Sequence, residues 1–276
     1  AFEGAQISGG QRAAPGAIER VRIDPATLEP RFRVIGVDAW SDEPAFAAGV
    51  AGAEGVGITG ICGSGIIEVV AELFLAGVVS EDGVIDGSLV ARTPRVISDG
   101  RTFSYGLHDG EGGASPRIVI TQNDVRAIQL AKAALYAGVR LLMDKLEVDA
   151  VDEIRLAGAF GSQIDPVHAM ILGLVPDCDL GHVKSAGNAA GTGALIALLS
   201  AAARAEIEGV VRRVEKIETA VEPRFQEHFV DAMAFPHKTA AFPNLANVVE
   251  LPERRGRPDA AEARGERRRR RAVAVS

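Results

Sequence analysis

The sequence predicts an α/β fold in which strands and helices pack in layers. First, short apolar runs typical of strands alternate with long amphipathic stretches typical of helices. Second, glycine-rich turns follow two of the predicted strands, at 157–162 and 186–194. Third, hydrophobic residues make up 47% of the 276 residues but aromatic ones only 5%. Such a composition predicts a core of small aliphatic side chains, which suits helices packed closely on a sheet.

The charge is unevenly distributed along the chain. The net charge is −7, but residues 253–271 contain nine arginines and four acidic residues. The rest of the chain therefore carries about −12, which argues against nucleic-acid binding by the folded part. We expect residues 1–250 to form one domain and residues 251–276 to be a disordered, arginine-rich tail.

The cysteine pattern and the hydropathy of the chain indicate which metal sites, compartment and membrane segments to expect. The only two cysteines, Cys62 and Cys178, lie far apart, and no C-x-x-C or H-x-x-x-H spacing occurs. This pattern predicts no zinc or iron–sulfur site in the chain and favours a reducing cytoplasm. No apolar run approaches the ~20 residues needed to span a bilayer, and no signal peptide is recognisable. The chain lacks a starting Met, so we expect further sequence upstream.

The first half of the chain is predicted to begin with a hairpin. Residues 17–23 and 32–38 alternate like strands, with a turn-rich connector between them. Residues 57–77 predict a helix that Ser64 caps and Gly77 ends. Its expected buried face is formed by Ile66, Ile67, Val70, Leu73 and Phe74. We expect a loop with short strands over 78–115.

The clearest unit of the sequence is a strand at 117–120 followed by a long helix. Thr121 and Asp124 have the spacing of a capping box at the helix start. Apolar residues then recur every three or four positions, which predicts a long amphipathic helix. The expected apolar face comprises Ile128, Ala131, Leu135, Val139, Leu142 and Leu146.

The strand-to-helix pattern then repeats twice. A strand at 152–156 enters the loop 157–162, and Asp165 and Pro166 then predict a helix start. A second short strand precedes the loop 186–194 and a long, alanine-rich helix. Beyond residue 204 we expect a helix and then a strand, and another helix near Pro223.

Both glycine loops could hold a phosphate. A turn between strand and helix points backbone N–H groups and the positive helix end outward. Neither loop matches G-x-x-x-x-G-K-[ST] or G-x-G-x-x-G, so neither a P-loop nor a Rossmann site is predicted. The alternative is that the glycines only allow helices to pack closely on a sheet. Two such loops in successive units favour a nucleotide.

Other candidate residues have simpler explanations. Cys62 lies before a helix start but lacks a recognisable catalytic partner, so a small buried cysteine is the expected role. His168 is expected to be packed or on the surface. Gln129 and Lys132 lie three residues apart on the long helix, where they could flank an adenine or ribose. The alternative for this pair is a solvated helix face.

Six separated sequence blocks together resemble a known family. The blocks are "AFEGAQISGGQRAAPGAIE", "GICGSGIIEVVAEL", "TQNDVRAIQLAKAALYAG", "LAGAFGSQIDPVHAMILGLVPD", "GNAAGTGA" and "VEPRFQEHFVDAM". In this order they resemble the C-terminal region of reductive activators of corrinoid proteins, over roughly residues 1–250. The resemblance implies an actin-like ATPase domain, of the superfamily of acetate and sugar kinases, heat-shock chaperones and actin. This domain would be incomplete at its N-terminus, with a mixed sheet and flanking helices.

The resemblance also implies a function. Such an activator delivers one electron to an inactive Co(II) corrinoid on a partner protein of methyl-transfer, or one-carbon, metabolism. ATP with Mg²⁺ drives the reduction to Co(I), and a 2Fe–2S domain upstream supplies the electron. Relatives suggest a homodimer. Neither nucleic acid nor a membrane is an expected partner.

Site residues are transferred from the family motifs. Gly158, Phe160, Gly161 and Ser162 resemble an adenosine motif, in which Gly158 lets the backbone approach the ribose or α-phosphate. The second loop resembles an interdomain connecting segment of the ATP site. Its candidate residues are Gly187, Asn188, Gly191 and Gly193. The helix that carries Gln129 and Lys132 resembles the adenine-flanking helix of chaperone relatives.

Three parts of the family pattern are not found in this sequence. Two phosphate-binding hairpin loops, the Mg²⁺ site that they organise and the cysteines of the cluster are all expected upstream of Ala1. We therefore expect no ATP hydrolysis by residues 1–276 alone, and the catalytic residues are not assigned. The alternative function is a non-catalytic docking module for a corrinoid protein. A Rossmann-type oxidoreductase is disfavoured because its glycine fingerprint is missing.

Overall fold

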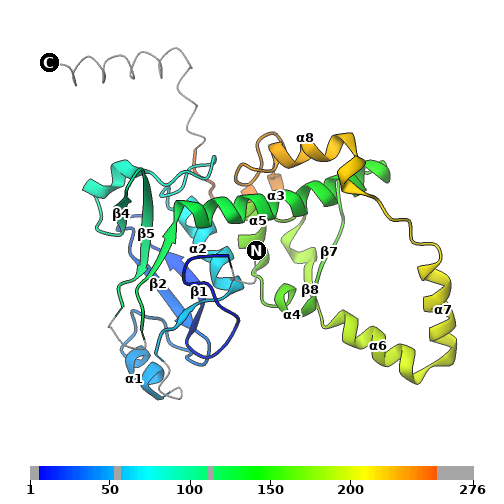
Figure 1. Ribbon diagram of the computed structural model, residues 1–276, viewed down its shortest axis with the longest axis horizontal. Helices are drawn as coiled ribbons and strands as arrows, with labels where there is room; N and C mark the ends of the chain where they lie inside the picture. Colours follow the sequence, from blue (N-terminus) through cyan, green and yellow to red (C-terminus); the bar gives the residue numbers. More distant parts are fainter. Residues whose placement is uncertain (1–5, 53–56, 111–114, 254–276) are drawn as a thin grey trace, which may run out of the picture.

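The computed structural model describes residues 6–52, 57–110 and 115–253. Three small sheets and their flanking helices are arranged around one long helix, α3 (Gln122–Lys145), which runs across the molecule (Figure 1). The predicted α/β class is therefore confirmed. The predicted tail, residues 251–276, lies almost entirely outside the described residues.

The first sheet confirms the predicted hairpin. Strands β1 (Ala17–Ile23) and β2 (Pro30–Val34) are antiparallel, and the short β3 (Gly60–Ile61) joins β1 in parallel. Strand β2 ends earlier than the pattern predicts, because the backbone turns at Gly36, whose φ is +95°. Helix α1 (Ala45–Gly52) follows the hairpin.

Helix α2 (Gly63–Leu75) forms the centre of this half and is buried on every side from Gly63 to Phe74. The predicted cap, Ser64, is wrong: the cap position is Cys62, which makes no side-chain capping hydrogen bond. The chain turns out of the helix at Gly77, whose φ of +69° fits the predicted stop. A helix buried all round is expected where a core lies on both of its sides.

Two buried glutamates of α2 complete the open edge of β1. Glu68 accepts a hydrogen bond from the backbone N–H of Val21 at 2.9 Å, and Glu72 accepts one from Ile23 at 3.0 Å. The two carboxylates lie four residues apart on the helix, and their donors lie two apart on the strand. The carboxylates thus satisfy edge N–H groups that a neighbouring strand would otherwise pair.

The region expected to be a loop with short strands forms a second, antiparallel sheet. After a 3₁₀ turn at Gly87–Ala91, strands β4 (Val96–Asp99), β5 (Thr102–His108) and β6 (Ile118–Thr121) pair in that order. The fully buried Tyr105 donates to the backbone carbonyl of Leu28 at 2.8 Å, which joins this sheet to the first hairpin.

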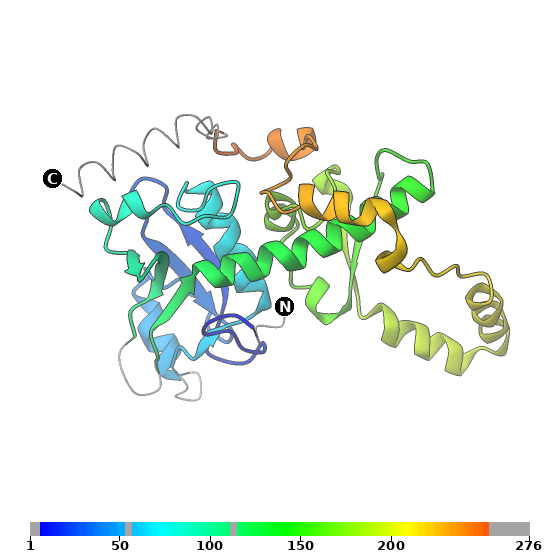
Figure 2. The same ribbon diagram turned by 45° about the horizontal axis from the view of Figure 1, so that its top comes forward.

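Helix α3 begins as predicted, but its buried face differs from the prediction. The capping box between Thr121 and Asp124 is present. Ile128 is buried, whereas Leu135, Leu142 and Leu146 are exposed by 46, 51 and 72%. The buried face differs from the predicted one because it mixes apolar residues such as Val125, Tyr136 and Leu141 with the polar Gln129 and Lys132. Figure 2 shows α3 passing from the β4–β6 side of the molecule to α8 (Pro223–Asp231).

The third sheet confirms the repeated strand-to-helix units. Strands β7 (Ile154–Ala157) and β8 (Val183–Gly187) are parallel. A single helical turn, α4 (Gly158–Gly161), follows β7, and α5 (Pro166–Leu172) comes next. Asp165 caps α5 through the backbone N–H of His168, and Pro166 occupies the first turn, as predicted. A 3₁₀ turn at Leu180–His182 precedes β8.

The alanine-rich segment forms two helices instead of one. Helix α6 (Ala189–Leu199) ends at Ser200, whose side chain caps α7 (Ala201–Val211). The expected strand beyond residue 211 is absent from the described chain, which has a 3₁₀ turn at Thr219–Val221. A short helix, α9 (Pro243–Ala246), follows α8. Both views show α6 and α7 extending away from the rest of the molecule (Figures 1 and 2).

Among the described residues, none of the helices combines the length and the apolar character needed to cross a bilayer.

Candidate functional site

The two glycine loops begin side by side. Ala157, at the end of β7, is the register partner of Gly187, at the end of β8. Because these strands are parallel, both chains leave the sheet at its same edge and turn there into helices. Ligands of open α/β sheets bind outside the carboxyl ends of such strands. The structure therefore brings the predicted residues 158–162 and 187–193 to one edge.

The first loop leaves its backbone open. Gly158 has φ of +92°, and a Cβ atom built there would meet no atom within 4 Å. Gly161, by contrast, is buried, and its Cβ would lie 3.1 Å from the backbone of Leu156. The Ser162 hydroxyl donates to the Ala159 carbonyl at 2.9 Å, and Phe160 is 37% exposed. One side of this loop packs on the sheet, while the other faces outward.

A cavity of about 630 Å³ adjoins this loop at residues 159–163, next to Gly158 but not lined by it. Its lining includes Ala159, Phe160 and Ser162 from the loop and Cys62 and Ser64 from the start of α2. Further lining residues are Gln11, Arg12, Ala13, Glu19, Ile35, Gly63 and Gln163. The sequence pattern over 57–77 predicts a helix and not a cavity wall, and no motif in the sequence points to Arg12. The glycines of "GICGSG" are the one feature of the sequence that could have indicated that the start of α2 lines a cavity.

The second loop supplies a similar bend. Gly187 has φ of +57°, and the Asn188 side chain accepts a hydrogen bond from the Gly191 backbone N–H at 3.0 Å. A Cβ at Gly191 would lie 2.5 Å from Asn188 Nδ2, so this cap needs a glycine. Gly193, one turn into α6, faces open space, since a Cβ there would meet no atom of the described chain. Asn188 thus acts here as the helix cap.

Gln129 and Lys132 lie together on the face of α3 that is turned away from solvent. They are 1 and 0% exposed, so the alternative of a solvated face is wrong. Gln129 Nε2 donates to the Asp82 carbonyl at 3.0 Å and to the Met233 carbonyl at 2.9 Å. Lys132 Nζ donates to the backbone carbonyls of residues 234 and 236. Burial lowers the pKa of Lys132 to about 7. In this structure the polar groups of both side chains are hydrogen-bonded within the chain, and their contact with adenine stays a prediction.

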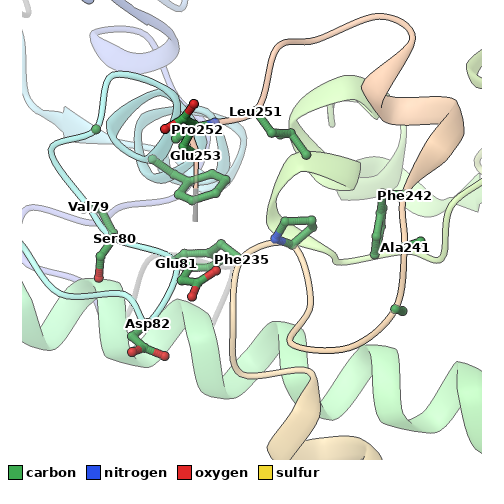
Figure 3. A pocket seen from close by; sticks show the side chains of 14 residues that line it. Val79, Ser80, Glu81, Asp82, Phe235, Ala241, Phe242, Leu251, Pro252 and Glu253 are labelled. Atoms are coloured by element: carbon green, nitrogen blue, oxygen red, sulfur yellow. The ribbon is translucent and has the colours of Figure 1, made fainter. Parts of the chain in front are cut away.

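The segment held by Gln129 and Lys132 forms one wall of a small cavity of about 180 Å³ (Figure 3). Phe235 and Phe242 line it from the C-terminal part of the chain; Phe235 lies beside Glu81, and Phe242 lies on the far side from Asp82. The Phe235 backbone N–H donates to the Glu81 carbonyl at 2.9 Å. The cavity thus lies between the chain near Glu81 and the chain near Phe235, which are joined by a hydrogen bond.

A buried charge network lies beneath the first glycine loop. Glu68, which is 1% exposed, accepts from Arg20 at 2.7 Å and from Arg22 at 2.6 Å. His168 Nε2 lies 2.8 Å from Glu72 Oε1, and its Nδ1 lies 2.9 Å from Asp165 Oδ1. This network joins β1, α2 and α5.

The network does not fit a metal ion. Glu68, Asp165 and His168 each offer a ligand atom within 4.8 Å of the others. However, two guanidinium groups already occupy the Glu68 oxygens, and His168 Nε2 is hydrogen-bonded to Glu72 at 2.8 Å. A divalent cation would have to displace these paired charges. Nor do the cysteines fit an iron–sulfur cluster, which needs four thiolates, since the sequence has two.

Comparison with known protein families shows which family this chain belongs to. The model of the "C-terminal domain of RACo the ASKHA domain" matches residues 1–246. The chain belongs to this family. Among curated proteins, it is 35% identical over 238 residues to the "Corrinoid activation enzyme RamQ" of Eubacterium limosum. That match covers 83% of this chain and 37% of the relative.

A solved structure agrees with the family assignment. The chain is similar to a "Reductive activator for corrinoid,iron-sulfur protein", with a TM-score of 0.71 and 33% sequence identity. The match covers 86% of this chain and 35% of the solved one. The predicted resemblance and fold are therefore confirmed. This ASKHA chain spans little more than a third of the length of the relatives that it matches.

Proposed function

We propose that this ASKHA chain is the adenine-nucleotide-binding part of an ATP-dependent reductive activator of corrinoid proteins. The observation that carries the proposal is the pairing of Ala157 with Gly187, which places two open strand-to-helix bends at one sheet edge. The names of the relatives support the activator function. A reducing cytoplasm suits the two free, buried cysteines.

The nucleotide would lie against the open backbone of the first loop. Gly158 presents an unshielded backbone, and Phe160 is the aromatic surface beside it on which a base could stack. Asn188 and Gly193 would border the nucleotide from the second loop. A role in packing alone would place neighbouring atoms where a Cβ of Gly158, Gly187 or Gly193 would lie. Open space at these three positions leaves room for a ligand beside the paired bends.

ATP would act on the corrinoid reaction through differential binding. Reduction of Co(II) to Co(I) needs an electron at a potential too low for an ordinary donor. A nucleotide can shift the equilibrium between two protein states only by the difference in its affinity for them. The two adjacent loops belong to separate strand-to-helix units, so a ligand that contacts both could favour one arrangement of the units. The 2Fe–2S cluster and Mg²⁺ would be held elsewhere in the intact protein.

The test is ATP hydrolysis by the intact protein that contains this chain. We expect the rate to rise when a Co(II) corrinoid protein is added, and to be unaffected by free cobalamin at the same concentration. A partner pull-down that succeeds without any ATP binding would instead support the docking alternative. Absence of both hydrolysis and corrinoid binding would contradict the proposal.

A further inference from the structure

The exit of the first glycine loop is held by two separate contacts. Arg20 of β1 donates from Nη1 to the backbone carbonyl of Gln163 at 3.2 Å. Two residues later, Asp165 caps α5 and lies 2.9 Å from His168 Nδ1. Strand β7 fixes the entry of the same loop. The loop is therefore clamped at both ends, although its outward side is open.

The first of these contacts depends on a buried acid. The Nη1 atom of Arg20 that bonds Gln163 also donates to Glu68 Oε1 at 2.7 Å. Glu68 is fixed in turn by the Val21 backbone N–H and by Arg22, at 2.9 and 2.6 Å. A charge-assisted hydrogen bond between fixed groups restricts the guanidinium to one orientation. The position of the Gln163 carbonyl is thus tied to α2.

We propose that Arg20 is a positioning residue for nucleotide binding, which holds the 158–163 loop in its binding geometry through the Gln163 carbonyl. The inference rests on the proposed nucleotide function. Gln163 and Glu19, the neighbour of Arg20, both line the cavity beside the loop. A change at Arg20 therefore reaches the cavity wall directly.

The chain offers a closely matched control in Arg22. Both arginines belong to β1, both pair with Glu68, and their side chains are 29 and 34% exposed. Arg22 additionally donates to the Val21 carbonyl, whereas Arg20 donates to Gln163. Loss of either arginine removes one ion pair to Glu68, and loss of Arg22 also removes its 3.9 Å contact with Glu72, but only loss of Arg20 releases the loop.

The test compares Arg20→Gln, Arg20→Lys and Arg22→Gln in the intact protein. Amide hydrogen exchange without nucleotide reports the loop itself. We expect exchange over 159–164 to rise at least tenfold in Arg20→Gln and to stay near the wild-type rate in Arg22→Gln. We expect the Kd for ATP, measured by calorimetry, to rise about tenfold in Arg20→Gln alone. Arg20→Lys, which keeps a donor at this position, should restore part of the affinity.

Two results would overturn the inference. One is an unchanged exchange rate and an unchanged Kd for Arg20→Gln. The other is an equal effect of Arg20→Gln and Arg22→Gln, because this would reduce Arg20 to a stabilising ion pair. Failure of the proposed function has a different signature: the wild type would not bind ATP, while Arg20→Gln still released the loop.

Discussion

Nε2 of His168 lies 2.8 Å from Oε1 of Glu72, so that one ion pair joins α5 to α2 inside the core. Asp165 lies on the other side of the same ring. Burial disfavours the charged ring, but hydrogen bonds to Asp165 and Glu72, with further attraction from Glu68, raise the pKa of His168 to about 9. The nearby cations of the network are Arg22, 3.9 Å from Glu72, and Arg20, which pairs with Glu68.

This ion pair predicts that stability falls in alkaline solution. The folded pKa of about 9 exceeds the ordinary value of 6.5. The contribution is therefore complete below pH 6.5 and is lost as the pH rises through 9. We expect the free energy of unfolding in urea to fall by up to about 3 kcal/mol between pH 6 and 9.5. His168→Gln should remove this dependence, while the exposed-site variant His182→Gln should keep it. Identical pH profiles for His168→Gln and wild type would contradict the assignment.

Asp144 is expected to be the principal ionic link between α3 and α8. It lies 2.6 Å from His228, 2.9 Å from Arg224 and 3.2 Å from Arg140. Asp144→Ala leaves these three side chains without their common partner, so we expect a loss of about 2 kcal/mol in the free energy of unfolding. Asp149 also pairs with Arg140, at 3.4 Å, but is fully exposed. Asp149→Ala should change stability by less than about 0.5 kcal/mol, and equal losses for the two variants would refute this ranking.

Lys132 is expected to stabilise the segment 233–240. Lys132→Met would leave the carbonyls of Ala234 and Pro236 without their donor, which costs roughly 2–4 kcal/mol when both are buried. We expect faster amide exchange over 233–240 and a lower melting temperature. Lys145→Met, at an exposed lysine of the same helix, is the control. A weaker affinity for ATP with no change in exchange or melting would instead indicate direct contact with the nucleotide.

The surface of α6 and α7 is expected to be covered in the intact protein. None of the residues in these two helices is buried within the described chain, and Leu198 and Leu199 are 73 and 81% exposed. The parallel strands β7 and β8 are also largely exposed, although parallel sheets are normally covered on both faces.

The matching experiment replaces one exposed leucine at a time in the intact protein. Leu198→Asp should lower the melting temperature by several degrees, because a charge would enter an apolar contact. Leu146→Asp, at the equally exposed leucine just after the end of α3, should have little effect. If neither variant melts earlier than the wild type, α6 is not covered.

Local signals in the sequence predicted local structure well. The capping box at Thr121 and the Asp165–Pro166 helix start involve residues within one turn, so their spacing in the sequence is their spacing in space. The glycine bends at 158 and 187 were likewise found from their neighbours alone.

Features that depend on distant segments were missed. Gln129 and Lys132 look like surface residues until the carbonyls of 233–236, about a hundred residues away, are placed against them. The same holds for Arg20, whose partners are Glu68 and Gln163. Apolar spacing also assigns Leu135 and Leu142 to the core, whereas both are exposed and the buried face carries Tyr136 and Leu141 beside the polar Gln129 and Lys132.

The most direct test of the central claim is a calorimetric titration of ATP into the intact protein and two glycine variants. Gly193 and Gly209 are both helical, and a Cβ at either would meet no atom within 4 Å. Only Gly193 lies beside the paired loops, so Gly193→Val should weaken ATP binding at least tenfold, while Gly209→Val should leave it unchanged. Equal affinity of both variants and the wild type, or no heat of ATP binding by the wild type, would contradict the account.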